Sequence, residues 1–209
     1  MTVCAATNNA GKLRELRRIL EKAGHTVRSL RELGVALDPE ETGATFEENA
    51  ALKAEAFCRV TGLPTVADDS GLCVDALNGE PGVYSARYAG THGDDAANNR
   101  KLLAALADVP AQARQARFVS AVCLLLPDGR RLVCRGECPG RIGTAGRGEN
   151  GFGYDPLFIP DFVGLPEGGK APNRASRTYA ELADAEKDAV SHRGRAMEKL
   201  EAALPAFLG

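Results

Sequence analysis

Tryptophan is absent from this sequence, and aromatic residues make up only 5% of it. Proteins hold single-stranded nucleic acids largely by stacking bases on aromatic side chains, so this scarcity argues against such a partner. The formal net charge of −2 also argues against binding to a nucleic-acid backbone, which needs a basic surface. We therefore expect no nucleic-acid partner.

Long apolar runs are missing as well. No window approaches the 18 consecutive apolar residues of a transmembrane helix, so we expect no membrane partner. The first residues lack the basic segment and apolar stretch of a signal peptide. None of the six cysteines forms a C-x-x-C pair, and most lie in apolar runs where cysteine acts as a small hydrophobe. These features predict a cytoplasmic protein in a reducing compartment.

The remaining composition is typical of a globular protein. Hydrophobic residues make up 44% and charged residues 26% of 209 residues, which is enough for a sizeable core. No internal repeat, heptad pattern or long interdomain linker interrupts the chain. We expect a single domain over residues 1–209.

The stretch Val66-Ala67-Asp68-Asp69-Ser70-Gly71-Leu72 is the most informative part of the chain. Residues 64–67 predict a strand that ends at the two carboxylates, and Ser70-Gly71 is expected to separate it from a second strand at 72–77. Because successive strand residues point to opposite faces, only one of Asp68 and Asp69 can face a given site. The two carboxylates repel each other, and a divalent cation would relieve that repulsion. Taken alone, a solvated turn is the alternative.

The amino-terminal segment predicts a strand at 2–6, a polar loop and a helix that stops at Gly24. The loop and helix start read Thr7-Asn8-Asn9-Ala10-Gly11-Lys12. A helix N-terminus with backbone N–H groups and a lysine is suited to bind an anion. It is not a Walker loop, because G-x-x-x-x-G-K-[ST] is absent. An ordinary strand-to-helix turn capped by asparagine is the alternative.

The middle of the chain predicts two helices and a hairpin. Residues 28–44 look irregular, and Thr45-Phe46-Glu47-Glu48 predicts the start of a helix that ends near Val60. Its spacing predicts that Leu52, Ala56 and Val60 point inward, whereas Lys53 by itself is expected on the surface. A helix at about 94–107 follows, and then an apolar strand at 118–126 that turns at Asp128-Gly129 into a partner strand at 132–134.

Glycines gather between residues 140 and 153, which predicts a flexible loop or a backbone pressed against a ligand. This segment ends in Phe152-Gly153-Tyr154-Asp155-Pro156, before a short strand at 157–159. Residues 164–177 are rich in Gly, Pro and basic residues and predict a mobile surface loop. Two helices are expected to close the chain, one from Thr178 and one after Ser191-His192-Arg193-Gly194.

Seven blocks of the chain, in the same order, resemble the inosine/xanthosine triphosphate pyrophosphatase family. The blocks are Thr7-x-Asn9-x-Gly11-Lys12; Glu40-Glu41-Thr42-Gly43 with Thr45-Phe46-x-Glu48-Asn49-Ala50; Leu52-Lys53-Ala54; Ala67-Asp68-Asp69-Ser70-Gly71-Leu72; Pro81-Gly82-Val83-Tyr84-Ser85-Ala86-Arg87-Tyr88; Gly151-Phe152-Gly153-Tyr154-Asp155-Pro156; and Ser191-His192-Arg193-Gly194. One block alone is weakly specific. Seven in order, spanning nearly the whole chain, are highly specific.

The resemblance implies an α/β fold in which a long mixed, twisted sheet is flanked by helices, with two lobes and a central active-site cleft, assembled as a homodimer. The implied reaction is Mg²⁺-dependent hydrolysis of non-standard purine nucleoside triphosphates (dITP, ITP and XTP) between the α- and β-phosphates. The products would be the monophosphate and pyrophosphate, and the reaction would cleanse the nucleotide pool.

The resemblance also implies roles for single residues. Glu41 and Asp69 would bind Mg²⁺, which prefers a few carboxylates together with water and phosphate oxygens, and Asp69 would activate the attacking water. Residues 7–12, with Lys12 foremost, would hold the triphosphate together with Lys53 and Ser70. The base would stack on Phe152, and the remaining residues of the base site would be Gly153, Tyr154, Asp155, Lys187, His192 and Arg193.

Base choice can be argued from hydrogen-bond donors. Arg193 carries only donors, so it suits the keto oxygen of hypoxanthine and xanthine and disfavours the amino group of adenine. Taken alone, His192 could equally be a histidine at the exposed start of a helix.

One departure from the family concerns the insertion near residue 170. Members pass quickly from the strand after the Phe-Gly-Tyr-Asp block to a Gly-Lys-Thr-x-Ala-Glu-Leu helix start. Here an insertion separates Gly169-Lys170 from Thr178, and Arg177 precedes that threonine. Any role for a lysine at this helix start is therefore in doubt.

Two other functions compete with this interpretation. A pyrophosphatase of similar fold that acts on pyrimidine or modified triphosphates would open with Ser-Pro-Arg-Arg in place of Thr-x-Asn-x-x-Lys. A non-catalytic nucleotide sensor would keep the base pocket, but the intact Asp68-Asp69 pair with Glu41 argues against it.

Overall fold

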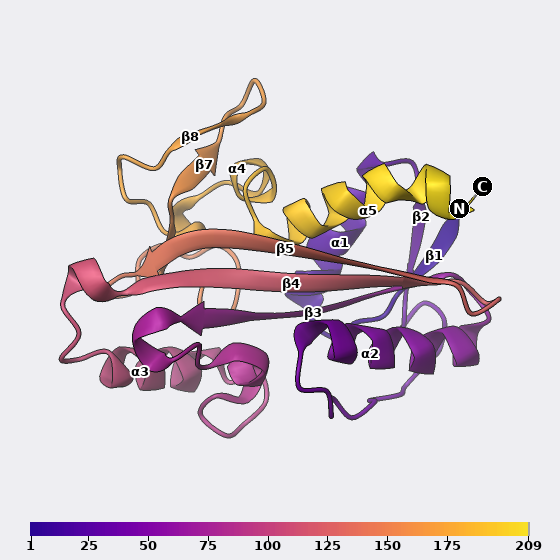
Figure 1. The fold of residues 1–209 in the computed structure, drawn as a ribbon, viewed down its shortest axis with the longest axis horizontal. Helices are drawn as coiled ribbons and strands as arrows, with labels where there is room; N and C mark the ends of the chain where they lie inside the picture. The colour runs from indigo at the N-terminus through magenta and orange to yellow at the C-terminus, as the bar shows by residue number, and fades with distance from the viewer. Residues whose placement is uncertain (209) are drawn as a thin grey trace. The chain divides into compact units, whose positions relative to one another are not determined.

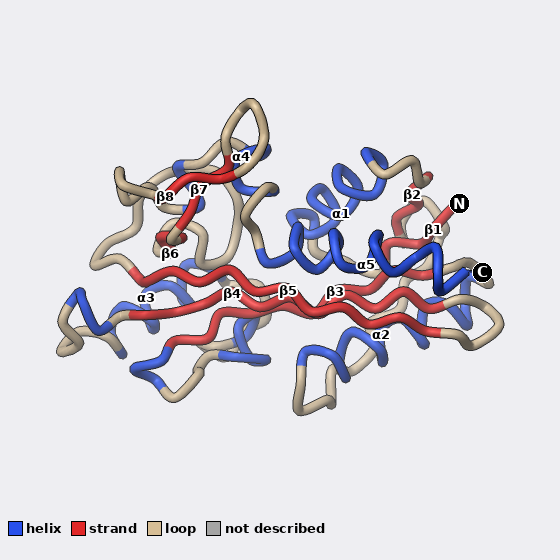
Figure 2. Tube along the Cα trace, turned by 45° about the horizontal axis from the view of Figure 1, so that its top comes forward, coloured by secondary structure: helices blue, strands red, loops and turns tan. Residues whose placement is uncertain are grey.

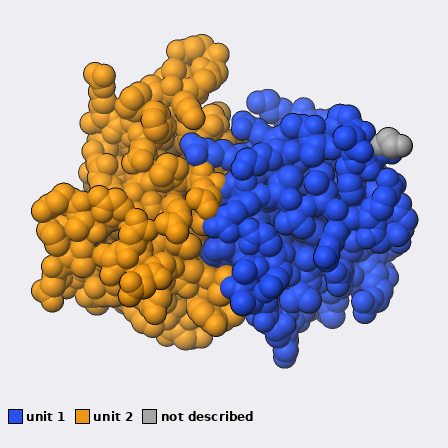
Figure 3. All heavy atoms as spheres, viewed as in Figure 1, with its two compact units in different colours: residues 1–69, 120–136, 193–209 blue, residues 70–119, 137–192 orange. Residues whose placement is uncertain are grey.

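The computed structural model describes residues 1–208. They form two compact units, each made of segments that are distant in the sequence (Figure 3). Unit 1 takes in Met1–Asp69, Ser120–Gly136 and the segment from Arg193 onward, and unit 2 takes in Ser70–Val119 and Glu137–His192. The chain passes from one unit to the other at four points. Three of these points lie inside long strands, so each of these strands contributes residues to both units.

The main sheet has six strands in the order β2-β1-β3-β4-β5-β6. Strand β1 pairs in parallel with β2 and β3, whereas β5 and β6 are antiparallel, so the sheet is mixed. This confirms the predicted α/β class with a mixed sheet. The strands are β1 Thr2–Ala5, β2 Thr26–Ser29, β3 Thr65–Val74, β4 Gln115–Leu125, β5 Arg131–Ile142 and β6 Phe158–Pro160.

The helices are α1 Ala10–Lys22, α2 Phe46–Thr61, α3 Asp95–Ala105, α4 Asp184–Asp188 and α5 His192–Leu208. Short 3₁₀ turns add η1 Asp75–Leu77, η2 Gly82–Arg87, η3 Ala111–Ala113 and η4 Tyr179–Glu181. Among residues 1–208, no helix combines the length and apolar character needed to cross a membrane.

Within unit 1, helices α1 and α5 cover one face of the strands and α2 covers the other (Figures 1 and 2). The apolar side chains under α1 and α5 form one core, which includes Val3, Ala5, Leu16, Leu20, Val27, Val66, Val122, Leu124, Ala196, Met197 and Leu200. Burial of these side chains against the sheet is the main favourable term that holds the two helices in place.

Unit 2 has its own core around an aromatic cluster. Phe118 packs edge to face on Phe158 at 4.8 Å and stacks on Tyr179 at 5.7 Å between ring centroids. Other buried members of this core are Leu72, Val74, Leu102, Leu106, Cys138, Ile142, Tyr154, Leu157, Leu182 and Val190. Phe118, Phe158 and Tyr179 are thus in mutual ring contact at the centre of this core.

The prediction of two strands separated at Ser70-Gly71 is wrong. Residues 65–74 form one continuous strand, β3, which lies between β1 and β4 in the sheet. Pairing with neighbouring strands satisfies backbone groups that a turn would otherwise use, so tertiary context overrides the local signal.

The predicted inward face of the helix at 45–60 is also wrong. Leu52 is 37% exposed and Val60 is 58% exposed, whereas Asn49, Lys53 and Phe57 are buried. The capping box at Thr45 and the end of the helix at Gly62 are as predicted. The buried face is displaced by about one position because Lys53 and Asn49 have partners in the interior, as described below.

Two segments are more regular than predicted. Strand β5 continues through Gly140 to Ile142, where a glycine-rich loop was expected. Residues 162–172 form a small antiparallel hairpin of β7 Phe162–Gly164 and β8 Lys170–Pro172, where a mobile loop was expected. The side-chain amide of Asn173 donates to the carbonyls of Pro160 and Arg177 at 2.9 and 2.8 Å and so closes the base of the hairpin.

Gly140 allows a close approach between β5 and β6, which predicts a specific loss of stability. A Cβ atom at this position would lie 2.3 Å from the Ile159 carbonyl oxygen and 2.9 Å from the Pro160 Cα. We expect Gly140→Ala to lower the free energy of unfolding by about 1–3 kcal/mol, the scale of overpacking, as measured by urea denaturation. Gly146→Ala is the matched control, because the added Cβ would meet its nearest neighbour at an ordinary 3.6 Å. Equal effects of the two substitutions would contradict this account.

Candidate functional site

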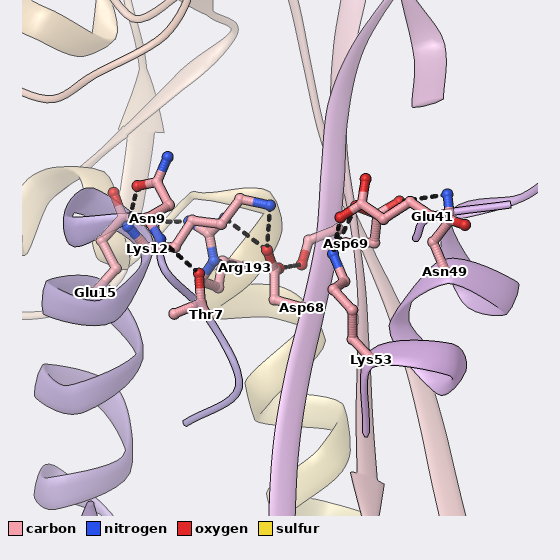
Figure 4. Close-up of polar contacts among 11 residues, drawn as sticks. Thr7, Asn9, Lys12, Glu15, Glu41, Asn49, Lys53, Asp68, Asp69 and Arg193 are labelled. Carbon is pink, nitrogen blue, oxygen red and sulfur yellow. Dashed lines mark hydrogen bonds and ion pairs between the residues drawn. The ribbon is translucent and has the colours of Figure 1, made fainter. Parts of the chain in front are cut away.

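Asp68 and Asp69 of strand β3 point to opposite faces of the sheet. Val66, two residues before Asp68, belongs to the core under α1 and α5. Side chains alternate along a strand, so Asp68 shares that face and Asp69 points toward α2. Figure 4 shows this division, with Lys12 and Arg193 beside Asp68 and Lys53 beside Asp69. The predicted alternation is confirmed.

Asp68 is the centre of a buried ionic cluster in unit 1. The Arg193 guanidinium donates to both of its carboxylate oxygens, at 3.2 and 3.1 Å. The Lys12 ammonium lies 3.0 Å from Oδ2, and the Ser120 hydroxyl donates to Oδ1 at 2.5 Å. The third guanidinium nitrogen of Arg193, Nη1, donates to Glu15 of α1. Four elements, α1, β3, β4 and α5, therefore meet at one carboxylate.

The environment of Asp68 keeps it ionised. Burial alone would raise its pKa, but the positive charges of Arg193 and Lys12 and the hydrogen bonds from Arg193 and Ser120 hold the pKa well below its usual range. A permanently ionised carboxylate with this many donors is a poor proton acceptor. Asp68 is thus suited to hold the surrounding helices and to orient Lys12.

Asp69 lies in a different cluster, on the side of α2. The Lys53 ammonium donates to Asp69 Oδ1 at 3.0 Å and to Glu41 Oε1 at 2.8 Å, so one lysine joins two carboxylates. The Asn49 amide donates to Asp69 Oδ2 at 3.2 Å and accepts the backbone N–H of Gly43 at 2.8 Å. Asn49 and Lys53 are four residues apart and share one face of the helix.

The two aspartates have opposite electrostatic character. Burial raises the pKa of Asp69, and the charges of Lys53 and Lys12 only partly offset this effect. Burial would lower the pKa of Lys53, but Asp69 and Glu41 outweigh it and raise that pKa, so the lysine stays charged. A carboxylate with a raised pKa beside a fixed positive charge is suited to accept a proton during a reaction.

The loop before α1 is ordered by its own side chains. Thr7 Oγ1 accepts the backbone N–H of Asn9 at 3.2 Å, and Asn9 Oδ1 accepts that of Lys12 at 2.9 Å. Asn9 is therefore the helix N-cap, as the alternative interpretation held, and the loop still presents the positive end of the helix dipole beside Lys12. Asn8 is exposed and donates to the Leu37 carbonyl at 3.5 Å. Ala10 and Gly11 form the first turn of the helix.

Glu41 and Asp69, the two carboxylates predicted to bind a cation, are brought together by Lys53. Across residues 1–208, no group of three or more His, Cys, Asp or Glu side chains is arranged to hold a metal ion. Mg²⁺ is commonly held by one or two carboxylates, with water and substrate phosphates completing its six ligands. The donor set around Lys53 fits that kind of site and does not fit a cation enclosed by protein alone.

Most residues predicted for the base site lie in unit 2. The Lys187 ammonium lies 2.7 Å from Asp155 Oδ2 and 5.0 Å from the centre of the Phe152 ring. Asp155 Oδ2 also accepts the backbone N–H of Phe152 at 3.0 Å. Gly151 permits this geometry, because a Cβ there would lie 2.0 Å from the same oxygen. The structure therefore brings Phe152, Asp155 and Lys187 together.

The other predicted base-site residues are placed differently. His192 is buried and stacks on Phe118 at 4.8 Å. Tyr179 stacks 6.4 Å from the His192 ring, and the Lys187 ammonium lies 5.2 Å from the centre of that tyrosine ring. His192 is therefore not an exposed helix-start histidine. Tyr154 is buried in the core of unit 2, and Gly153 has a positive φ of 62°. Arg193 belongs to unit 1, where it binds Asp68 and Glu15. Ser70 is half-buried in unit 2.

Sequence reasoning missed three members of these clusters. Asn49 lies in a matching block but was given no role, and its position four residues before Lys53 was an available signal. Glu15 follows Lys12 by three residues on α1 and is only 5% exposed. Ser120 reaches Asp68 from β4, 52 residues away, and no local signal pointed to it.

The chain is similar over nearly its whole length to one known family and to several named proteins. The family model described as the Ham1 family matches residues 3–203. The chain is 56% identical over 210 residues to a protein of Nocardia farcinica named dITP/XTP pyrophosphatase, covering 98% of this chain and 95% of that one. A solved nucleoside-triphosphatase, dITP/XTP pyrophosphatase, of Mycobacterium abscessus is 49% identical, with a TM-score of 0.71 and coverage of 96% and 98%. The Ham1 protein of Staphylococcus aureus is 41% identical, with a TM-score of 0.79 and coverage of 99% of each chain.

The Asp68 cluster predicts a large effect of removing one charge. Asp68→Asn would leave Arg193, which is 1% exposed, without its main counter-charge. We expect the free energy of unfolding to fall by about 3–5 kcal/mol, as for other broken buried pairs, measured by denaturant titration followed by circular dichroism. Asp128→Asn is the control: its partner Arg130 and the aspartate itself are about half exposed, so we expect no comparable loss, because exposed ion pairs contribute little to stability. A similar small loss in both variants would refute the structural role of Asp68.

Proposed function

This chain belongs to the Ham1 family, and we propose that it hydrolyses the anhydride between the α- and β-phosphates of dITP, ITP and XTP to the monophosphate and pyrophosphate. The names of its relatives in Nocardia farcinica and Mycobacterium abscessus support this substrate class. The observation that carries the proposal is the Lys53 ammonium held between Glu41 and Asp69, with Lys12 at the start of a helix beside the same strand.

The chemistry follows from the two carboxylate environments. Asp69, with its raised pKa, accepts a proton from the attacking water. Lys53 and Lys12 are the positive charges that stabilise the charge developing on the phosphate oxygens, and the dipole of α1 adds to them. Ser70 contributes a further hydrogen bond to the triphosphate. Asp68 orients Lys12 and does not exchange protons.

Magnesium is part of the proposal. Glu41 and Asp69 would hold Mg²⁺ together with phosphate oxygens of the substrate, and the ion would polarise those phosphates when bound. In the structure Lys53 donates to these same carboxylate oxygens. The lysine therefore holds the two carboxylates close together, so that both would be within reach of one cation that arrives with a polyphosphate.

Base selection rests on the cluster around Asp155. Phe152 provides the stacking face, and the Asp155–Lys187 pair presents an acceptor and a donor to the edge of the base. His192 and Arg193 are the further base-site residues, and Arg193 suits a keto oxygen. Arg193 already donates hydrogen bonds to Asp68 and Glu15. We therefore propose that Asp155 and Lys187 contribute most to the distinction between keto and amino purines.

Assembly, domain organisation and location complete the proposal. We propose one two-lobed domain with a central active-site cleft. We also propose that the chain forms a homodimer through the loop of Tyr84 and Tyr88, since Tyr84 is 59% exposed. Light scattering tests this: we expect the mass of two chains, and a stable monomer would contradict the dimer. A cytoplasmic location is supported by the thiols: the six cysteines, all in the described part of the chain, are buried and take part in no disulfide. Burial raises the pKa of Cys4 to about 11, so this thiol stays protonated.

The direct test is release of pyrophosphate from dITP with and without Mg²⁺. We expect dITP, ITP and XTP to yield monophosphate and pyrophosphate, with ATP at least about 10-fold slower, the scale of one unmatched buried donor. Orthophosphate as the first product, or preference for a pyrimidine triphosphate, would contradict the proposal. Binding of dITP without turnover would indicate a nucleotide sensor instead.

Asp69→Asn keeps the size of the side chain and removes the proton acceptor. We expect turnover of dITP to fall by at least about 10²-fold, the usual contribution of a general base, measured in steady state at saturating Mg²⁺. Near-normal turnover would assign the role to another group. Asp75→Asn is the control, because Asp75 lies on η1 in an exposed ion pair with Arg117.

Glu41→Gln removes one of the two carboxylates proposed for the cation. We expect the Mg²⁺ concentration at half-maximal rate to rise about 10-fold or more, since few protein ligands hold the ion. Glu40→Gln is the matched control one residue away. An unchanged Mg²⁺ requirement in the Glu41 variant would exclude Glu41 from the cation site.

A further inference from the structure

Helix α3 has no role in the function proposed above, yet two of its side chains bind the backbone of the base-stacking loop. Asp95 Oδ2 accepts the backbone N–H of Gly153 at 2.7 Å. Asn99 Nδ2 donates to the carbonyl of the same glycine at 2.9 Å. Asp95 and Asn99 are four residues apart, so they share one face of the helix. These three residues and Phe152 all belong to unit 2.

Gly153 is the residue most in need of such support. It follows Phe152 directly, has a positive φ of 62°, and closes a segment rich in glycine. Glycine loses more backbone freedom on ordering than any other residue, so this segment does not hold its shape unaided. With both backbone polar groups of Gly153 bound, the peptide planes on either side of it are fixed in direction.

The neighbouring residues are anchored by other contacts. The Tyr154 hydroxyl donates to the Ser85 carbonyl at 2.8 Å, and Asp155 accepts from Lys187 at 2.7 Å. These contacts hold the carboxyl side of the loop. The contacts from α3 hold Gly153, which lies between Phe152 and these residues in the sequence.

Helix α3 is held in unit 2 by its own cap, its buried side chains and a hydrogen bond to a neighbouring loop. Its N-cap Asp94 accepts the backbone N–H of Ala97 at 2.9 Å, and Leu102 is fully buried in the core of unit 2. Asn98, which is 2% exposed, accepts the backbone N–H of Ala89 at 2.7 Å. Asp95 is exposed and is not needed as the cap, so its carboxylate is available for Gly153.

We propose that Asp95 and Asn99 are positioning residues that preorganise the Phe152 stacking face for the purine base. The inference rests on the proposed function only for the identity of the ligand. If the loop is ordered before the base arrives, less conformational entropy is lost on binding. Loss of the α3 contacts should then weaken binding of substrate and transition state equally, which raises KM and leaves kcat unchanged.

The kinetic test uses Asp95→Ala, Asn99→Ala and the double variant. We expect KM for dITP to rise about fivefold in each single variant, the scale of one hydrogen bond, with kcat unchanged. Inhibition by pyrophosphate, which lacks a base, should stay the same, whereas inhibition by dIMP should weaken in parallel with KM. Asp95→Asn keeps an acceptor oxygen and should recover part of the loss, and Arg100→Ala, an exposed change on the same helix, should have no effect.

A second test does not depend on catalysis. The chain contains no tryptophan, so Phe152→Trp introduces a single fluorescent reporter into the loop. In that background, Asp95→Ala should shift the emission to longer wavelength and increase quenching by acrylamide, without any nucleotide present. If the wild-type chain released no pyrophosphate from dITP, the proposed function would fail while this comparison still tested the role of α3.

Two results would overturn the inference. One is unchanged fluorescence together with unchanged KM in the double variant. The other is an equal loss of pyrophosphate and dIMP inhibition, which would indicate a general effect on the fold.

Discussion

The ionised carboxylate of Asp68, buried under α1 and α5, is the constraint on which the arrangement of Lys12, Arg193 and the helices that carry them depends. A charge in that position is stable only when donors surround it, and the chain supplies them from three other elements: Lys12 of α1, Ser120 of β4 and Arg193 of α5. Satisfying one carboxylate thus fixes the positions of two helices and two strands. The same contact orients Lys12 at the N-terminus of α1, so structural stability and preparation of the anion site have a common origin.

Two identical side chains, adjacent in the sequence, acquire opposite properties because a strand turns them to opposite faces. Asp68 meets two positive side chains and its pKa falls, whereas Asp69 is buried with one direct lysine partner and its pKa rises. Pairs of carboxylates whose environments separate their pKa values are a common basis for division of roles in catalysis. Here one aspartate holds charge permanently and the other can exchange a proton. Lys53 joins Asp69 to Glu41 and so completes the second environment.

The sequence predicted the elements better than it predicted which faces are buried. Capping at Thr45 and the helix from Ala10 are local features, so they could be predicted from a few neighbouring residues. The alternation of Asp68 and Asp69 follows from strand geometry and was also predictable. Lys53 was expected on the surface because the partners that allow its burial, Glu41 and Asp69, are 12 and 16 residues away. Ser120 and Glu15 reach their partners only through the tertiary fold, and local patterns contain no information about them.

The segment around residue 170, where the sequence differs from the motif expected of the family, has its own set of contacts. Arg177 stands where a lysine was expected, and it forms two hydrogen bonds with Glu186, at 3.1 and 2.7 Å. The capping box of Thr178 and Glu181 is present directly after it. The Asn173 amide donates to the carbonyls of Pro160 and Arg177, so the chain before the hairpin and the chain after it lie close together. The ion pair of Lys187 with Asp155 forms in the segment after this hairpin, without a lysine directly before Thr178.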